Sequence, residues 1–342
     1  MGNLITKGKT EKTGSRIAFV SFLQFVGVIS VIFGHSMNSI SVPTFLTDIK
    51  AWVYTYHMPL FFFVSAFLFS YKGGYDRGYK NVLTKRFSRL IIPYLLWNAI
   101  FIIPKVLFRN YIYDEVSFSA EYFTRIILRP RDNILGHTWF LCALFEMFIL
   151  AILFDRAKKH KTLWLPITLA LVVVNCFGVE NRWLAVGDLM KNGIFFWCGL
   201  MLGTITTDEI ERNLKDNKSF VSVLLLTIGT SIVWALNSDM LINTLVLGMS
   251  ALAMFMILQI KLNLGGGLVD FVSNNSFPIY IMHWPVIMVL RLVFYQKLGV
   301  TAVVAMIINL ILGFAIPCII TLILRKINIA WFKKVCAVVF GM

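Results

Sequence analysis

Charged residues are scarce in this sequence. Asp, Glu, Lys and Arg together make up only 14% of the 342 residues, whereas 58% are hydrophobic. A soluble domain of this length needs a wetted surface, which so few charged side chains do not provide. Apolar runs long enough to cross about 30 Å of hydrocarbon recur instead from residue 17 to the last third of the chain. The composition predicts an all-α polytopic integral membrane protein.

Cysteine pairs and nucleotide-binding motifs are missing as well. The five cysteines are an odd number, have no CxxC or metal-ligand spacing, and mostly lie within apolar runs. We therefore expect neither a disulfide framework nor a metal site. No P-loop, GxSxG or dinucleotide-binding pattern occurs, and the glycine run 265–267 lacks the GK[ST] that a phosphate loop requires. Any chemistry must therefore come from other residues.

Acidic residues are few: 17 Asp and Glu stand against 32 Lys and Arg, for a net charge of +15. Such an excess is also found in nucleic-acid-binding proteins. Here, however, the basic residues are spread through short loops, as expected for a protein that touches anionic lipid headgroups. We predict membrane lipid as a partner, and no nucleic acid.

The hydrophobic runs predict about ten spanning helices in a single membrane-embedded domain, 1–342, with no appended soluble domain. Between the third and fourth spans, apolar residues recur at helical spacing over 118–128, which predicts a short helix in the interface. The predicted spans lie near 17–40, 50–70, 88–108, 137–155, 162–178, 187–205, 219–236, 240–260, 274–295 and 300–325.

The orientation follows from the basic residues. The first run, 17–40, is longer than the apolar region of a typical signal peptide, so we retain it as the first span. With the N-terminus inside, 22 of the 32 Lys and Arg residues fall on the inner side. Because cytoplasmic loops retain positive charge, both termini are expected in the cytoplasm.

Ionisable residues deep in a span cost about 2.5 to 3.5 kcal/mol, so each needs a partner, a cavity or a function. His35 ends the first run in VIFGH, and a histidine titrates near neutrality, which suits proton abstraction from a hydroxyl. A histidine that is only hydrogen-bonded between helices fits equally well. Gln24 lies eleven residues earlier, about three turns or ~16 Å along the same helix face. That face is expected to line the interior.

Two further residues are candidates for orienting His35. Glu146 falls near the middle of the fourth span, seven residues after Trp139 and on the same helix face. It is either a functional carboxylate or a neutral hydrogen-bonding group between helices. His57 precedes Pro59, which predicts a kinked helix at a cavity wall; a histidine that merely satisfies the broken turn is the alternative.

The remaining candidates concern binding. Arg86 and Arg89 are three residues apart and project from one helix face, where two guanidinium groups suit phosphate oxygens or anchor the helix end. Tyr280 and His283 lie in the ninth span, where His283 fits a packing role better than a catalytic one. With Trp139, these two residues are expected to line the cavity.

The motifs VIFGH, HMPLFFFVSAFLF, KRFSRLIIPY, TWFLCALF and IYIMHWPVI occur in this order along the chain. Together they resemble the acyltransferase-3 family of bacterial membrane O-acyltransferases, particularly its stand-alone members of the fucose 4-O-acetylase-like and O-antigen acetylase-like kind. The resemblance covers essentially the whole chain. It implies ten spans with both termini inside, in the bacterial cytoplasmic (inner) membrane.

The resemblance also implies transfer of an acyl group, usually acetyl from cytoplasmic acetyl-CoA, to a hydroxyl of a cell-surface polysaccharide or its lipid-linked precursor. His35 matches the essential first-span histidine of the family, and Arg86 and Arg89 match an R-x-x-R element that contacts the acyl donor. Gln24 departs from the pattern, because many members carry a basic residue there. Larger relatives append a periplasmic hydrolase-like domain, which is not expected here.

A transporter or flippase of a lipid-linked sugar or small acid is the alternative, because it too needs a polar interior in the membrane. The sequence leaves open which sugar and hydroxyl are modified, whether the acyl group is acetyl or larger, on which side of the membrane the acceptor reacts, and whether transfer is direct or covalent. It also leaves the oligomeric state open.

Overall fold

The computed structural model describes residues 17–107, 119–157, 159–178, 181–237 and 241–341, and all regular secondary structure in these residues is helical. The α-helices are α1 (Ala18–Ser36), α2 (Thr44–Tyr54), α3 (His57–Tyr71), α4 (Tyr79–Leu107), α5 (Ala120–Leu128), α6 (Trp139–Ala157), α7 (Trp164–Phe177), α8 (Val186–Leu202), α9 (Thr207–Leu214), α10 (Asn217–Leu236), α11 (Leu241–Leu262), α12 (Gly267–Asn274), α13 (Ser276–Leu290), α14 (Ala302–Lys326) and α15 (Ala330–Val339).

Within the described residues, seven helical stretches are long and apolar enough to cross a membrane: α1, α2 with α3, α4, α10, α11, α13 with the π-helix that follows it, and α14. Helix α7 is apolar but shorter. A helix also lies in each of the ten predicted ranges. The prediction of an all-α polytopic membrane protein is confirmed, and the number of ten spans remains a prediction.

The structure differs from prediction in the second range. Instead of one kinked helix over 50–70, α2 ends at Tyr54 and α3 begins at His57. Pro59 therefore lies in the first turn of α3, where a missing backbone N–H leaves no helical hydrogen bond unmade. Helix α4 also begins at Tyr79, earlier than the predicted 88. The short helix predicted over 118–128 is confirmed as α5.

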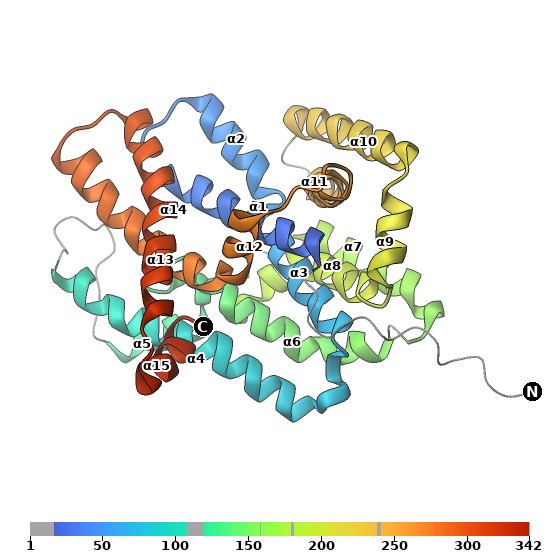
Figure 1. Cartoon of the computed structure of the whole chain (residues 1–342), viewed down its shortest axis with the longest axis horizontal. Coiled ribbons are helices and arrows are strands. Elements are labelled where there is room, and N and C mark those ends of the chain that lie inside the picture. The colour runs from blue at the N-terminus through green and yellow to red at the C-terminus, as the bar shows by residue number, and fades with distance from the viewer. Residues whose placement is uncertain (1–16, 108–118, 158, 179–180, 238–240, 342) are drawn as a thin grey trace, which may run out of the picture.

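Helix α1 lies at the centre of the molecule, in contact with α3, α11, α12, α13 and α14 (Figure 1). Its neighbour α3 packs closely on α8, because α8 carries Gly199 and Gly203 on one face. A Cβ atom at these glycines would lie 2.3 Å from the Phe63 carbonyl oxygen and 2.6 Å from that of Phe67. The two backbones approach as in other pairs of membrane helices with small residues four apart.

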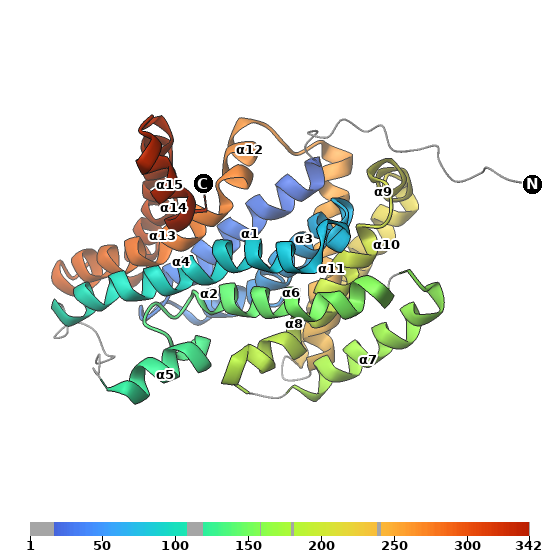
Figure 2. The same cartoon turned by 90° about the horizontal axis from the view of Figure 1, so that it is seen from below.

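Helix α10 lies at one edge of the molecule in Figure 1 and has no buried residue. Its exposed side chains are largely apolar, including Leu225, Ile232 and Leu236. This surface is compatible with lipid and not with water. At another edge, α5 and the segment that leads from it to α6 lie near the start of α8, as Figure 2 shows.

Candidate functional site

Two cavities lie at opposite ends of α1. The first, of about 410 Å³, is lined by Val31 and His35 near the end of α1, and we call it the histidine cavity. The second, of about 710 Å³, is lined by Gln24 near the start of α1, and we call it the basic cavity. One face of α1 therefore serves both cavities, as the spacing of Gln24 and His35 predicted.

Three histidine rings pack together beside the histidine cavity. The ring centroid of His35 lies 5.1 Å from that of His283 and 6.3 Å from that of His137, and the latter two are 5.3 Å apart. They come from the end of α1, from α13 and from the segment before α6. His137 and His283 are buried, and Trp284 packs edge-on against His35 at 4.8 Å. Distant parts of the chain thus converge on His35.

Hydrogen bonds to backbone carbonyls fix which nitrogen carries the proton in two of these rings. Nδ1 of His137 lies 3.0 Å from the Leu135 carbonyl oxygen, and Nδ1 of His283 contacts the Tyr280 carbonyl oxygen. Since a carbonyl only accepts, Nδ1 is the donor in both rings, and Nε2 of a neutral ring is then unprotonated. These Nε2 atoms and Nδ1 of His35 are buried without a hydrogen-bond partner among the described residues.

His57 lies at the same cavity, although not beside His35. As the first residue of α3 it lines the cavity wall, and its ring stacks at 4.4 Å on Tyr54, the last residue of α2. Tyr54 in turn covers Gly34, where a Cβ atom would lie only 2.2 Å from its ring. The break between α2 and α3 therefore places both rings at the cavity.

Basic side chains dominate the second cavity. Lys72, Lys85, Arg86 and Arg89 line it, and no acidic side chain in the described part of the chain does so. The Arg86 guanidinium lies 4.0 Å from the ring centroid of Phe148, a cation–π contact that orients it.

Two hydrogen bonds support the walls of the basic cavity. Tyr75 donates to the Phe148 carbonyl oxygen, and burial raises the pKa of the Tyr75 phenol, so it remains protonated. Gln24 accepts a hydrogen bond of 2.7 Å from the Ser273 hydroxyl. The amide at this position is therefore held by Ser273 of α12.

Three aromatic rings pack together at the wall of the basic cavity, and one of them also lines the histidine cavity. Phe61 and Phe140 line the basic cavity, whereas Tyr280 lines both. The ring centroids are 5.8 Å apart for Phe61 and Phe140, 5.7 Å for Phe140 and Tyr280, and 6.3 Å for Phe61 and Tyr280. The Tyr280 hydroxyl donates to the His137 carbonyl oxygen at 2.5 Å. Tyr280, which both cavities share, is thus hydrogen-bonded to His137, one of the three histidines beside the histidine cavity.

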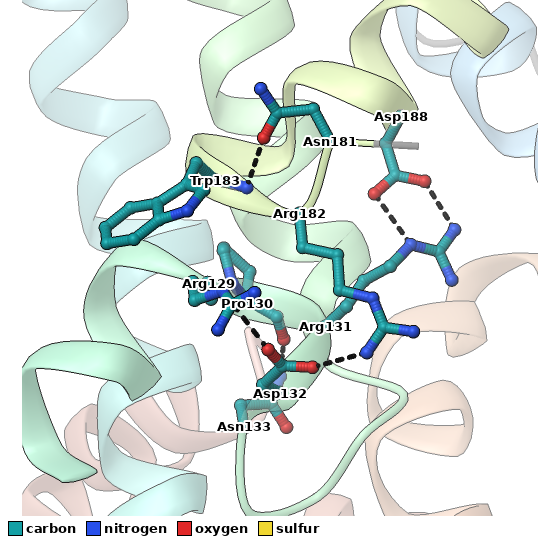
Figure 3. A network of polar contacts seen from close by, with 9 residues as sticks. All are labelled: Arg129, Pro130, Arg131, Asp132, Asn133, Asn181, Arg182, Trp183 and Asp188. Atoms are coloured by element: carbon teal, nitrogen blue, oxygen red, sulfur yellow. Dashed lines mark hydrogen bonds and ion pairs between the residues drawn. The ribbon is translucent and has the colours of Figure 1, made fainter. Parts of the chain in front are cut away.

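A network of ion pairs fixes the rim of the histidine cavity (Figure 3). Arg131 donates from Nε and Nη2 to the two carboxylate oxygens of Asp188, and its guanidinium lies 4.1 Å from the ring centroid of Trp139. Beside this pair, Asp132 accepts from Arg182 at 2.8 Å. The network joins the segment before α6 to the start of α8.

The predicted residues divide between the two cavities. His35, His57, Trp139 and Tyr280 line the histidine cavity, and Gln24, Arg86 and Arg89 line the basic cavity with Tyr280. His283 is completely buried against His35 and lines neither cavity.

Glu146 also lines neither cavity, so the groups beside His35 are histidines where a carboxylate was expected. Two other acids, Asp155 and Asp188, are buried in the described structure.

His137 was not selected from the sequence. It is the first residue of the predicted span 137–155, directly before the TWFLCALF motif, and a polar residue at a span end gives no local sign of burial. The one sequence feature that indicated His137 was its position directly before the TWFLCALF motif. In the described residues, no group of three or more His, Cys, Asp or Glu side chains is arranged to hold a metal ion.

Comparison with known sequences identifies the family. The model of an acyltransferase domain matches residues 17–325, which include every residue assigned above to the two cavities. No curated protein and no solved structure matches the chain. Because this match covers most of the chain and contains both cavities, the protein belongs to the acyltransferase-3 family of membrane acyltransferases.

Proposed function

We propose that this acyltransferase moves an acyl group, acetyl in the simplest case, from acyl-CoA to a hydroxyl of a cell-surface polysaccharide or its lipid-linked precursor. The observation that supports this most directly is the pair of cavities that meet at Tyr280, one basic and one containing His35. A transferase with two unlike substrates needs two binding regions that share one reacting position.

The basic cavity suits the acyl donor. Coenzyme A carries several phosphate charges, which do not enter hydrocarbon without cationic partners. Four basic side chains at the start of α4 and the end of α3 provide such partners, and arginine can bind phosphate oxygens through two N–H groups at once. The predicted orientation turns this cavity toward the cytoplasm of a bacterial cell, where acyl-CoA is made. The thioester arm then extends toward Tyr280.

The histidine cavity suits the acceptor. In the proposed reaction His35 takes the proton of the acceptor hydroxyl, and the oxygen bonds to the thioester carbonyl carbon. The carbon–sulfur bond breaks, the thiolate leaves, and the proton on His35 passes to the sulfur to give free coenzyme A. The unprotonated Nε2 atoms of His137 and His283 can accept an N–H of the protonated His35 ring, which stabilises its positive charge.

A covalent route places the acetyl group on His35 before the acceptor takes it. Purified protein incubated with radiolabelled acetyl-CoA and no acceptor distinguishes the two routes, because only the covalent route labels the protein.

The test of the proposed function uses purified protein in lipid nanodiscs with radiolabelled acetyl-CoA and surface glycan extracted from a strain that lacks this gene. Wild-type protein is expected to label the glycan, and His35→Ala at equal expression is expected to leave it unlabelled. Full labelling by His35→Ala, or no labelling by the wild type with every glycan fraction, would falsify the proposal.

The arrangement of two cavities at opposite ends of one helix also favours a second candidate, a transporter of a lipid-linked sugar or small acid. Transport predicts movement of the sugar across a sealed vesicle membrane without consumption of acetyl-CoA. Release of free coenzyme A in step with glycan labelling would exclude this candidate.

A further inference from the structure

Only two charged side chains line the histidine cavity among the described residues, Arg131 and Lys191, and both are basic. The other lining groups are histidine, aromatic, hydroxyl, amide or apolar. A neutral sugar needs hydroxyl-binding groups and aromatic faces, but its binding does not require positive charge. The charge of this cavity is therefore a feature that acyl transfer to a neutral hydroxyl leaves unexplained.

Arg131 is held rigidly with part of its hydrogen-bonding capacity unused. Asp188 binds its Nε and Nη2 atoms, and the Trp139 ring lies under the guanidinium plane. Figure 3 shows that Nη1 is directed away from Asp188. A guanidinium group fixed along one edge presents its remaining N–H groups in a defined direction, which favours binding of an oxyanion.

Lys191 supplies the second charge. Its backbone carbonyl accepts a hydrogen bond of 2.6 Å from the side-chain amide of Asn175, which ties α8 to α7 at this point. Among the described residues, Lys191 has no ion pair. An ammonium without a carboxylate partner at the wall of a cavity is available to a ligand.

Neighbouring groups suit a sugar. The amide nitrogens of Asn175 and Asn192 are used by the backbone carbonyls of Lys191 and Asp188, which leaves their oxygens as acceptors for hydroxyl groups. Trp284 also lines the cavity, and aromatic faces stack on the apolar faces of sugar rings. Polar acceptors, an aromatic wall and two cations thus surround one space of about 410 Å³.

We infer that the acceptor is an anionic glycan, whose phosphate or carboxylate binds Lys191 and Arg131 while a nearby hydroxyl reaches His35. The inference rests on the proposed function, which it deepens by naming the acceptor class. Recognition of the charge fixes the sugar in the cavity, and the hydroxyl closest to His35 is then the one modified.

The test measures binding and transfer separately, with wild-type protein in phosphatidylcholine nanodiscs. The probes are matched pairs: methyl glucuronide with methyl glucoside, methyl galacturonide with methyl galactoside, and glucose 1-phosphate with glucose. At least one charged probe is expected to bind about tenfold more tightly than its neutral partner, as one charge-assisted contact would produce. Lys191→Ala should remove this preference, Lys191→Glu should reverse it, and Lys191→Arg should retain it.

The control variant is Lys297→Ala, since Lys297 is exposed and lines neither cavity; it should bind every probe as the wild type does. If no charged probe binds better than its neutral partner, or if Lys191→Ala weakens both equally, the inference is overturned. If the charged probe is no longer preferred when phosphatidylglycerol is added, Lys191 and Arg131 bind a lipid headgroup. That result would also overturn the inference.

The transfer measurement separates this inference from the proposed function. Preferential binding of a charged probe without acetyl transfer to any probe or glycan supports an anionic-glycan site at Lys191 and Arg131 and contradicts acyl transfer. If acetyl transfer is equally efficient to the charged and the neutral probe of each pair, the inference is contradicted and the proposed function stays intact.

Discussion

The imidazole rings of His35 and His283 lie 5.1 Å apart, centroid to centroid, although 248 residues separate them in the chain. His283 donates from Nδ1 to the Tyr280 carbonyl oxygen, and its Nε2 has no partner among the described residues. The unshared electron pair of that atom can only interact with a donor. His283 can therefore accept a hydrogen bond from the His35 ring when that ring gains a proton in the proposed reaction.

Replacement of His283 tests this relationship. In His283→Phe the ring volume is largely kept, but no basic nitrogen remains to stabilise protonated His35. We expect kcat to fall by about tenfold to a hundredfold, because general base catalysis by a positioned side chain contributes about 10²–10⁴ and only part of it is lost here. The Michaelis constant for acetyl-CoA should change little, since His283 does not itself line the basic cavity. An unchanged kcat in a stably folded variant would show that His283 only packs.

In the basic cavity, the guanidinium of Arg86 lies 4.0 Å from the ring centroid of Phe148, which orients it. Arg86→Lys keeps the charge but removes the planar group, at a cost of about 0.5 to 2 kcal/mol. We expect the Michaelis constant for acetyl-CoA to rise severalfold, with a smaller increase for Arg89→Lys, whose side chain is exposed. The matched control is Lys80→Ala, an exposed residue of α4 outside the cavity. An equal effect of Lys80→Ala would mean that general surface charge, not the cavity, attracts the donor.

The sequence predicted the helices and the two ends of the site well, for a physical reason. Apolar runs of spanning length and isolated ionisable residues are both local signals, because burial in lipid constrains each segment separately. His35, Arg86 and Arg89 were therefore candidates from the sequence, and the family resemblance, not the local signal, favoured a functional role for them. The helix break after Tyr54 was not, since Thr55 and Tyr56 are not helix-breaking residues and tertiary contacts decide the break.

The partners of His35 could not be predicted in the same way. His137 and His283 approach it from segments about 100 and 250 residues away, and no spacing rule connects such distant positions. Glu146 attracted attention because a carboxylate in a span is costly, yet depth along a helix does not specify direction around it. Only the packing of α6 against α4 and α8 determines which way that side chain points.

Gly34 offers a test of how closely α1 packs on Tyr54. A Cβ atom in Gly34→Ala would lie 2.2 Å from Cε1 of Tyr54, so the ring that lines the histidine cavity must move. We expect a loss of about 1 to 3 kcal/mol in the free energy of unfolding, together with lower activity. Gly229→Ala in α10 is the control, because nothing lies within 4 Å of its added Cβ. That variant should be as stable as the wild type or more stable by up to about 1 kcal/mol.

A double variant strengthens this test. Tyr54→Ala removes the ring that Gly34→Ala displaces, so the two changes should not add when they are combined. Additive losses in thermal unfolding would contradict a direct clash between these positions.

Phe61 lines the basic cavity and packs against Tyr280, which lines both cavities, with the ring centroids 6.3 Å apart. Its ring covers Gly27 so closely that a Cβ atom there would lie 2.9 Å from Cζ. On the proposed path from the basic cavity to His35, the acyl end of the donor passes this ring. We expect Phe61→Ala to widen the passage, so that butyryl-CoA and hexanoyl-CoA are used more efficiently relative to acetyl-CoA, with Phe61→Leu intermediate. The ratio of kcat/KM values for the three donors measures this preference, independently of any general loss of stability.

Phe25→Ala is the matched control, because Phe25 is a partly buried ring on α1 that lines neither cavity. Both substitutions remove a phenyl ring and are expected to cost up to about 3 to 5 kcal/mol where the ring is buried. Only Phe61→Ala should change the ratio of donors. If both variants keep the wild-type ratio of kcat/KM values for the three donors, residues other than Phe61 determine the size of the acyl group. Tyr280→Phe would then be the next variant to compare, because Tyr280 lines both cavities.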